Sequence, residues 1–170
     1  MNLTAVVVHV PEAEPLVGEL RLRHTDDGRA GMPPHVTLLV PFVPAPRLSP
    51  EVEKRLAEIV GAVEAFEVTF PRTARFPSVL YLEPEPSEPF VALTRAIVAA
   101  WPVHPPYEGV FDEVIPHLTV AESEDAELLD RLAAEVEPRL PVAARVTEAK
   151  LFEEDEAGHW HERSRLQLAR

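Results

Sequence analysis

Apolar residues recur along this chain at two alternating spacings. Some segments are β-branched or carry an apolar residue at every second position, which is typical of strands. They are residues 3–10, 35–42, 66–76, 79–82, 117–121, 142–152 and 159–168. Other segments carry apolar residues three or four positions apart, which is typical of amphipathic helices. They are residues 15–23, a helix that Ser49 caps and Pro50 opens, a helix that includes 90–101, and a helix that Ser123 caps. The pattern predicts an α+β protein.

The order of these segments repeats in the two halves of the chain. Each half begins with a strand and a helix, continues through a loop to a second strand, and ends with a helix and a strand. The length and this repetition predict a single domain over residues 1–170. We expect it to consist of two pseudo-symmetric lobes, approximately 1–76 and 77–170. Paired halves of this kind bring equivalent strands together across a shared axis.

One short motif occurs once in each half. The string Pro-His-Val-Thr-Leu at 34–38 returns as Pro-His-Leu-Thr-Val at 116–120. Because side chains alternate between the faces of a strand, His35 and Thr37 share one face, and so do His117 and Thr119. Two imidazoles can serve as proton donor and acceptor near neutral pH, and two hydroxyls can donate to an oxyanion such as phosphate. The repeat therefore predicts one acid–base site between the halves.

The charge balance limits what such a site can bind. The chain has 16 Lys and Arg against 29 Asp and Glu, a formal net charge of −13. Proteins that follow a long nucleic-acid backbone normally carry a basic stripe, so we expect no extended nucleic-acid footprint. No apolar run approaches the roughly 20 residues of a membrane helix. The chain has no cysteine, which excludes disulfides and thiolate chemistry. With a first segment that reads as a strand rather than a signal peptide, this favours a cytoplasmic location.

With both motifs placed, the chain resembles the 2H phosphoesterase superfamily, which includes 2′-5′ RNA ligases and RNA 2′,3′-cyclic phosphodiesterases. That family has two His-x-Thr/Ser-x motifs on central strands of two similar lobes. Here residues 33–42, 75–82 and 111–121 also resemble the usual context of the motifs. The resemblance implies a bilobal fold in which antiparallel sheets line a central cleft and the helices lie outside.

The resemblance also implies a function. It is a metal-independent hydrolysis of a nucleoside or RNA-terminal 2′,3′-cyclic phosphate, with weak 2′-5′ ligation as the reverse reaction. His35 and His117 would be the acid–base pair, and Thr37 and Thr119 the phosphate-binding hydroxyls. The partner would be a small cyclic nucleotide or an RNA 3′ end, with no cofactor and no metal.

Four further residues are candidate substrate contacts. Arg29 and Arg75 could supply the local positive charge that the overall composition lacks, and Tyr81 and Phe42 could stack a base. Surface placement of the arginines and core packing of the aromatics are the alternatives.

Three other functions stay open at this stage. The enzyme could act on another small cyclic or 2′-5′-linked nucleotide, or the chain could be a non-catalytic nucleotide-binding module. His159 and His161, near several carboxylates, could bind a metal, although a solvated strand face is the stronger interpretation. The sequence does not assign the base and the acid, and it does not set the oligomeric state.

Overall fold

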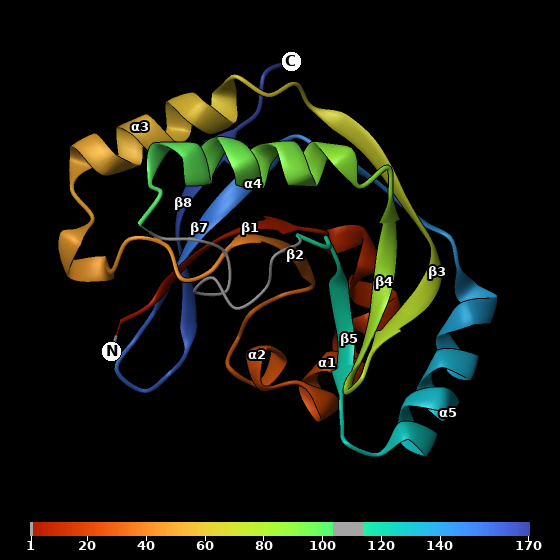
Figure 1. Ribbon diagram of the computed structural model, residues 1–170. Helices are drawn as coiled ribbons and strands as arrows, with labels where there is room; N and C mark the ends of the chain where they lie inside the picture. Colours follow the sequence, from red (N-terminus) through yellow and green to blue (C-terminus); the bar gives the residue numbers. More distant parts are fainter. Residues whose placement is uncertain (1, 104–113) are drawn as a thin grey trace.

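The computed structural model describes residues 2–103 and 114–170. Within them the strands form one curved antiparallel sheet in the order β6-β3-β4-β5-β2-β1-β7-β8 (Figure 1). The strands are β1 (Thr4–His9), β2 (His35–Leu39), β3 (Phe66–Phe76), β4 (Val79–Glu85), β5 (Leu118–Glu122), β6 (Val142–Val146), β7 (Glu148–Glu154) and β8 (Trp160–Gln167). The mixed fold with an antiparallel sheet is the one predicted. Part of the predicted loop at 102–111 lies outside the described residues.

The helices are α1 (Glu14–His24), α2 (Asp26–Arg29), α3 (Pro50–Gly61), α4 (Glu88–Ala100) and α5 (Ala126–Val136), with short 3₁₀ turns at Pro11–Ala13, Ala45–Arg47 and Glu137–Arg139. Of these, α2, α3 and α5 begin at a side-chain cap. Ser49 Oγ accepts from the Val52 amide at 3.2 Å, as expected of an N-cap. The prediction that Ser123 caps α5 is wrong. Asp125 is the cap, and its carboxylate accepts from the amides of Glu127 and Leu128. Ser123 instead accepts from the Asp125 amide.

The segment at 142–152 is two strands rather than one. Val142 and Val146 are buried, but further along the buried residues are Ala149 and Leu151, so the alternation changes phase between them. Because a phase change turns the other face of a strand toward the core, one straight strand cannot bury all four. The chain breaks at this point, and β6 pairs with β3 while β7 pairs with β1.

The two halves of the sheet do not follow the expected division at residue 76. β3 precedes that residue but pairs with β4 and β6, whereas β7 and β8 follow it and extend the sheet from β1. The physical reason is the two-residue turn between β3 and β4, since a tight hairpin must leave its strands adjacent. The first motif therefore lies in the half β2-β1-β7-β8, and the second in the half β5-β4-β3-β6.

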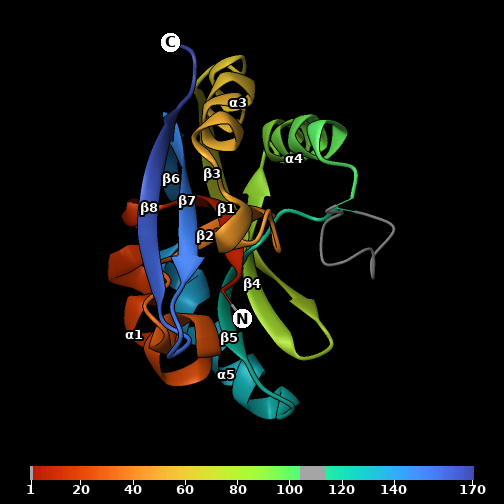
Figure 2. The same cartoon turned by 90° about the vertical axis from the view of Figure 1, so that its left-hand side faces the viewer.

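Two helices each pack against a strand of the other half of the sheet. α1 follows β1 but packs against β5, and α4 follows β4 but packs against β2. Figure 2 shows α3 and α4 at one end of the molecule and α1 and α5 at the other. One apolar core joins these helices to the sheet, with Phe70, Phe90, Leu38 and Leu118 fully buried in it. Each motif strand is thus supported by a helix from the other half.

No helix within the described residues is long and apolar enough to span a membrane.

Candidate active site

The two motif strands lie side by side at the centre of the sheet. Val36 of β2 pairs with Leu118 of β5 in antiparallel register. One step along each strand, this register sets His35 opposite Thr119 and Thr37 opposite His117. Residues one step from a pair share the other face of the sheet, so all four side chains lie on one face. Each histidine of one motif therefore faces the threonine of the other.

Both imidazoles are held in the same way. His35 Nδ1 lies 2.7 Å from the Pro33 carbonyl oxygen, and His117 Nδ1 lies 2.7 Å from that of Ile115. A carbonyl can only accept, so each Nδ1 carries a proton and the neutral ring has its lone pair on Nε2. The proline between acceptor and histidine explains the geometry, because a residue before proline is held extended. The repeated Pro-His pair thus fixes two equivalent tautomers.

The two histidines differ in burial. His35 is 6% exposed, and burial lowers the pKa of its imidazole to about 3, with the positive charge of Arg21 as the second cause. The hydrogen bond to Pro33 acts in the opposite direction and is too weak to reverse this. His117 is half-buried, and burial lowers its pKa below the ordinary value. The two histidines are therefore equivalent in position and differ in burial.

Arg21 of α1 is a site neighbour that the sequence analysis missed. It is 2% exposed, and its guanidinium donates to the Thr119 carbonyl at 2.8 Å and to the Met32 carbonyl at 3.0 Å. A signal was present, since Arg21 stands one helical turn after buried Val17 on the inward face of α1. A charged residue at a core position of a helix is rare unless it is paired.

Two aromatic rings border the second histidine. Tyr81 of β4 pairs with Thr119, and its ring centroid lies 5.4 Å from that of His117. The ring of Phe76, at the end of β3, lies 5.1 Å from His117 and 4.5 Å from Tyr81. Tyr81 therefore lies beside the motif residues, and its role as a base-stacking contact stays a prediction. Phe76 was not singled out there, and the alternation in β3 together with the hairpin to β4 could have indicated it.

The other candidate contacts are held elsewhere. Phe42 is 1% exposed and packs edge-on against Trp101 at 5.0 Å, so it is a core residue and cannot stack a base. Arg75 pairs with Leu80, on the opposite face of the hairpin from Tyr81, and its guanidinium binds Asp130 of α5 at 2.8 Å. Arg29 binds Asp26 at 2.6 Å and the Arg23 carbonyl, which keeps it at α2. The structure does not bring Phe42 or Arg75 to the four motif residues.

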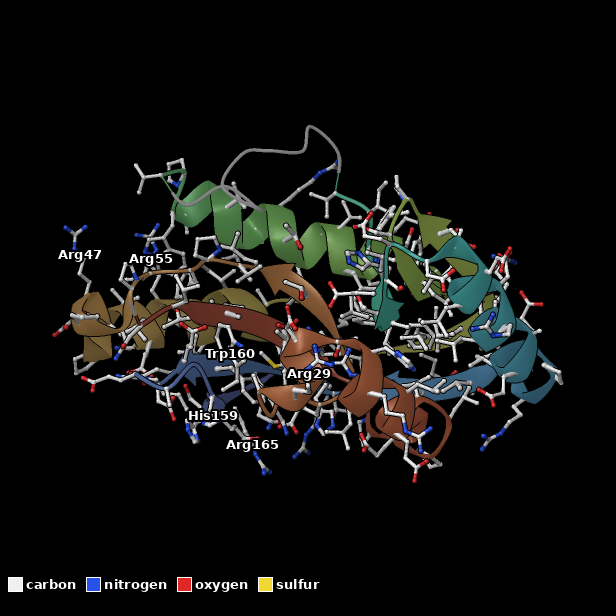
Figure 3. The ribbon with its side chains drawn as sticks, turned by 90° about the horizontal axis from the view of Figure 1, so that it is seen from below. Arg29, Arg47, Arg55, His159, Trp160 and Arg165 are labelled. Carbon is white, nitrogen blue, oxygen red and sulfur yellow. The ribbon has the colours of Figure 1, made fainter. Side chains whose placement is uncertain are left out.

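His159 belongs to the turn between β7 and β8, and His161 is the second residue of β8, where it pairs with Glu153. Figure 3 shows His159 and Trp160 in the part of the molecule where Arg29 lies, in agreement with a hydrogen bond from the Trp160 amide to the Ala30 carbonyl at 2.8 Å. Asp155 accepts from the His159 amide and binds His161 at 2.7 Å, and these bonds lower the pKa of its carboxyl to about 2. Within residues 2–103 and 114–170 no three metal-binding side chains gather. This cluster shapes the turn.

The crossed His-x-Thr motifs define the 2H class of phosphoesterases. The sequence model of the 2′-5′ RNA ligase superfamily matches residues 9–158 of this chain. The chain therefore belongs to that superfamily and is a phosphoesterase.

Solved structures share the whole fold. E. coli LigT complexed with 3′-AMP is 18% identical, with 99% of each chain covered and a TM-score of 0.65. The protein TT0787 of Thermus thermophilus is 19% identical, with 98% of this chain and 97% of that chain covered and a TM-score of 0.67. A crystal structure described as a phosphoesterase is 20% identical over 100% of both chains, with a TM-score of 0.61. No curated protein matches the chain in sequence.

Proposed function

We propose that the protein is a metal-independent cyclic phosphodiesterase that hydrolyses a nucleoside or RNA-terminal 2′,3′-cyclic phosphate. The observation that carries this proposal is the register of β2 and β5, which sets each motif histidine opposite the threonine of the other motif. In this arrangement one histidine can accept a proton and the other can donate one on two sides of the same phosphorus, and each histidine has a threonine hydroxyl beside it. Structures of E. coli LigT with 3′-AMP, ATP and NADP⁺ support a nucleotide as the ligand class.

The four residues can carry out an in-line displacement. One neutral imidazole accepts a proton from water through Nε2 as the water oxygen forms a bond to phosphorus. The bond from phosphorus to the 2′ or 3′ oxygen breaks, and the second imidazole, in its protonated form, gives that oxygen its proton. Thr37 and Thr119 donate to the non-bridging oxygens, where negative charge must be held in the transition state. The same displacement with a nucleotide hydroxyl in place of water would join the cyclic phosphate to that hydroxyl, with the 2′ or 3′ oxygen again leaving and taking a proton, and this would give weak ligation.

The asymmetry of burial supports an assignment of the two roles. With a pKa of about 3, protonating His35 at pH 7 costs about 5 kcal/mol, since each pKa unit is 1.36 kcal/mol. An acid role for His35 would add this cost to every turnover. We therefore assign His35 as the base and His117, which is less buried, as the acid.

The surroundings of the site favour a small substrate or a terminal nucleotide. Phe76 and Tyr81 form an aromatic wall beside His117 that suits a base or a ribose. The net charge of −13 opposes a long phosphate backbone.

Turnover of 2′,3′-cyclic AMP tests this function. We expect hydrolysis to a single nucleoside monophosphate, with the same rate in EDTA, because the proton transfers use imidazoles alone. Chromatography of the products gives both the rate and the position of the phosphate. Hydrolysis restricted to 2′-5′-linked dinucleotides would instead support the alternative substrate class, and nucleotide binding without any turnover would support a binding module.

The pH profile of kcat/KM follows from the two pKa directions. His35 must be neutral, so activity is lost only as the pH falls through its pKa of about 3. His117 must be protonated, so activity falls as the pH rises through a pKa that lies below 6.5. We expect an acidic optimum for kcat/KM, with kcat shifted to higher pH because a bound phosphate favours both imidazolium forms. A kcat/KM that rises from pH 6 to pH 8 would contradict the role assignment.

A further inference from the structure

Arg21 connects the segments that carry the two motifs. Its Nη1 donates to the carbonyl of Thr119, a motif residue of β5, and its Nη2 donates to the carbonyl of Met32, three positions before His35. The register pairs the two strands at one point, Val36 with Leu118. The guanidinium therefore adds a second link between the motif segments, and this link comes from a helix that packs against β5.

The equivalent link in the other half is neutral. α4 packs against β2 as α1 packs against β5, and Thr94 Oγ1 of α4 donates to the Leu38 carbonyl at 2.7 Å. A hydroxyl is thus sufficient to tie a helix to a motif strand in this fold. A guanidinium that is 2% exposed costs far more to bury than a neutral donor. A hydrogen bond from helix to strand therefore does not by itself explain why residue 21 of α1 carries a charge.

The charged groups around Arg21 come from four elements. Asp27 of α2, Glu122 of β5 and Glu14 of α1 act favourably on its charge, and their effect opposes the burial that lowers the pKa of the guanidinium. His35 of β2 is the group that the same charge acts against, and among its charged neighbours Arg21 outweighs His117 and His9. The positive charge of Arg21 therefore lowers the pKa of His35, and it is not among the causes that lower the pKa of His117.

We propose that Arg21 is a positioning residue for the two motif segments. Its two hydrogen bonds hold the carbonyl of Thr119, the residue opposite His35, and the carbonyl of Met32, three positions before His35, and its buried positive charge disfavours a second positive charge on that imidazole. The catalytic consequence rests on the proposed function. The charge state of His35 does not, because it can be measured without a substrate.

The test compares Arg21→Gln, which keeps a donor but no charge, with Arg21→Lys, which keeps the charge. The pKa of His35 is measured by NMR titration of the imidazole carbons in the full chain. We expect Arg21→Gln to raise the pKa of His35 by about one pH unit or more, as removal of a nearby like charge does, and Arg21→Lys to leave it low. Thr94→Val is the matched control, because it removes the neutral tie and should lower the melting temperature without changing the pKa of His35.

The outcomes separate the two proposals. An unchanged His35 pKa in Arg21→Gln, or an equal rise in Thr94→Val, overturns the role of Arg21. If Arg21→Gln does not fold, Arg21→Lys decides, since a rise to the ordinary histidine value despite the retained charge also overturns it. In active protein, the acid limb of kcat/KM should move with the His35 pKa. A shifted pKa in a protein that hydrolyses no cyclic nucleotide would sink the proposed function and leave the role of Arg21 intact.

Discussion

Replacing His35 or His117 with alanine should lower kcat/KM for 2′,3′-cyclic AMP by about 10²–10⁴-fold, the usual contribution of one positioned proton transfer. Each histidine faces the partner motif across β2 and β5, so neither can replace the other. The measurement is initial-rate kinetics at several pH values. Because His35 is buried, melting curves must show that the variant is folded.

His159→Ala is the matched control for this experiment. That histidine belongs to the exposed turn after Asp155, which binds its amide, and its removal should leave the rate close to that of the unmodified protein. The double variant His35→Ala/His117→Ala should lose less than the product of the two single losses, since residues that act as a unit are not additive. Near-normal turnover in either single variant would refute the paired acid–base mechanism.

Thr37→Val and Thr119→Val should each lower kcat by about 10²–10³-fold, as removal of one oxyanion donor does elsewhere. Valine keeps the shape and the strand preference of threonine, so the change removes little besides the hydroxyl. Serine keeps the hydroxyl, and Thr37→Ser and Thr119→Ser should retain most of the activity. Equal rates for the valine and serine variants would show that the hydroxyls do not hold the phosphate.

The central strands and helices could be predicted from the chain because their signals are local. The bounds of β3, residues 66–76, follow from alternation, and the start of α3 follows from Ser49 and Pro50. The motif histidines and threonines could be chosen because they recur in strands with the same spacing. A shared face for each His-Thr pair follows from the period of a strand.

The remaining features depend on contacts between distant segments. No local pattern states that β7 and β8 return to pair beside β1, so the division at residue 76 did not match the sheet. The burial of Phe42 against Trp101 and the ion pair of Arg75 with α5 depend in the same way on packing between elements. The assignment of His35 as the base needed its burial, with the charge of Arg21 as the second cause of its lowered pKa, and both exist only in the folded chain.

The exchange of helices between the halves has a consequence for how the protein can be divided. A chain cut in the turn at 77–78 would yield one fragment with β3 but without its partners β4 and β6, and another with β7 but without β1. Neither fragment contains a complete half-sheet, and the first would carry α1 without the strand that it covers. The repeat seen along the chain is therefore not a pair of separable modules. The two halves of the sheet must therefore assemble together, as one cooperative unit.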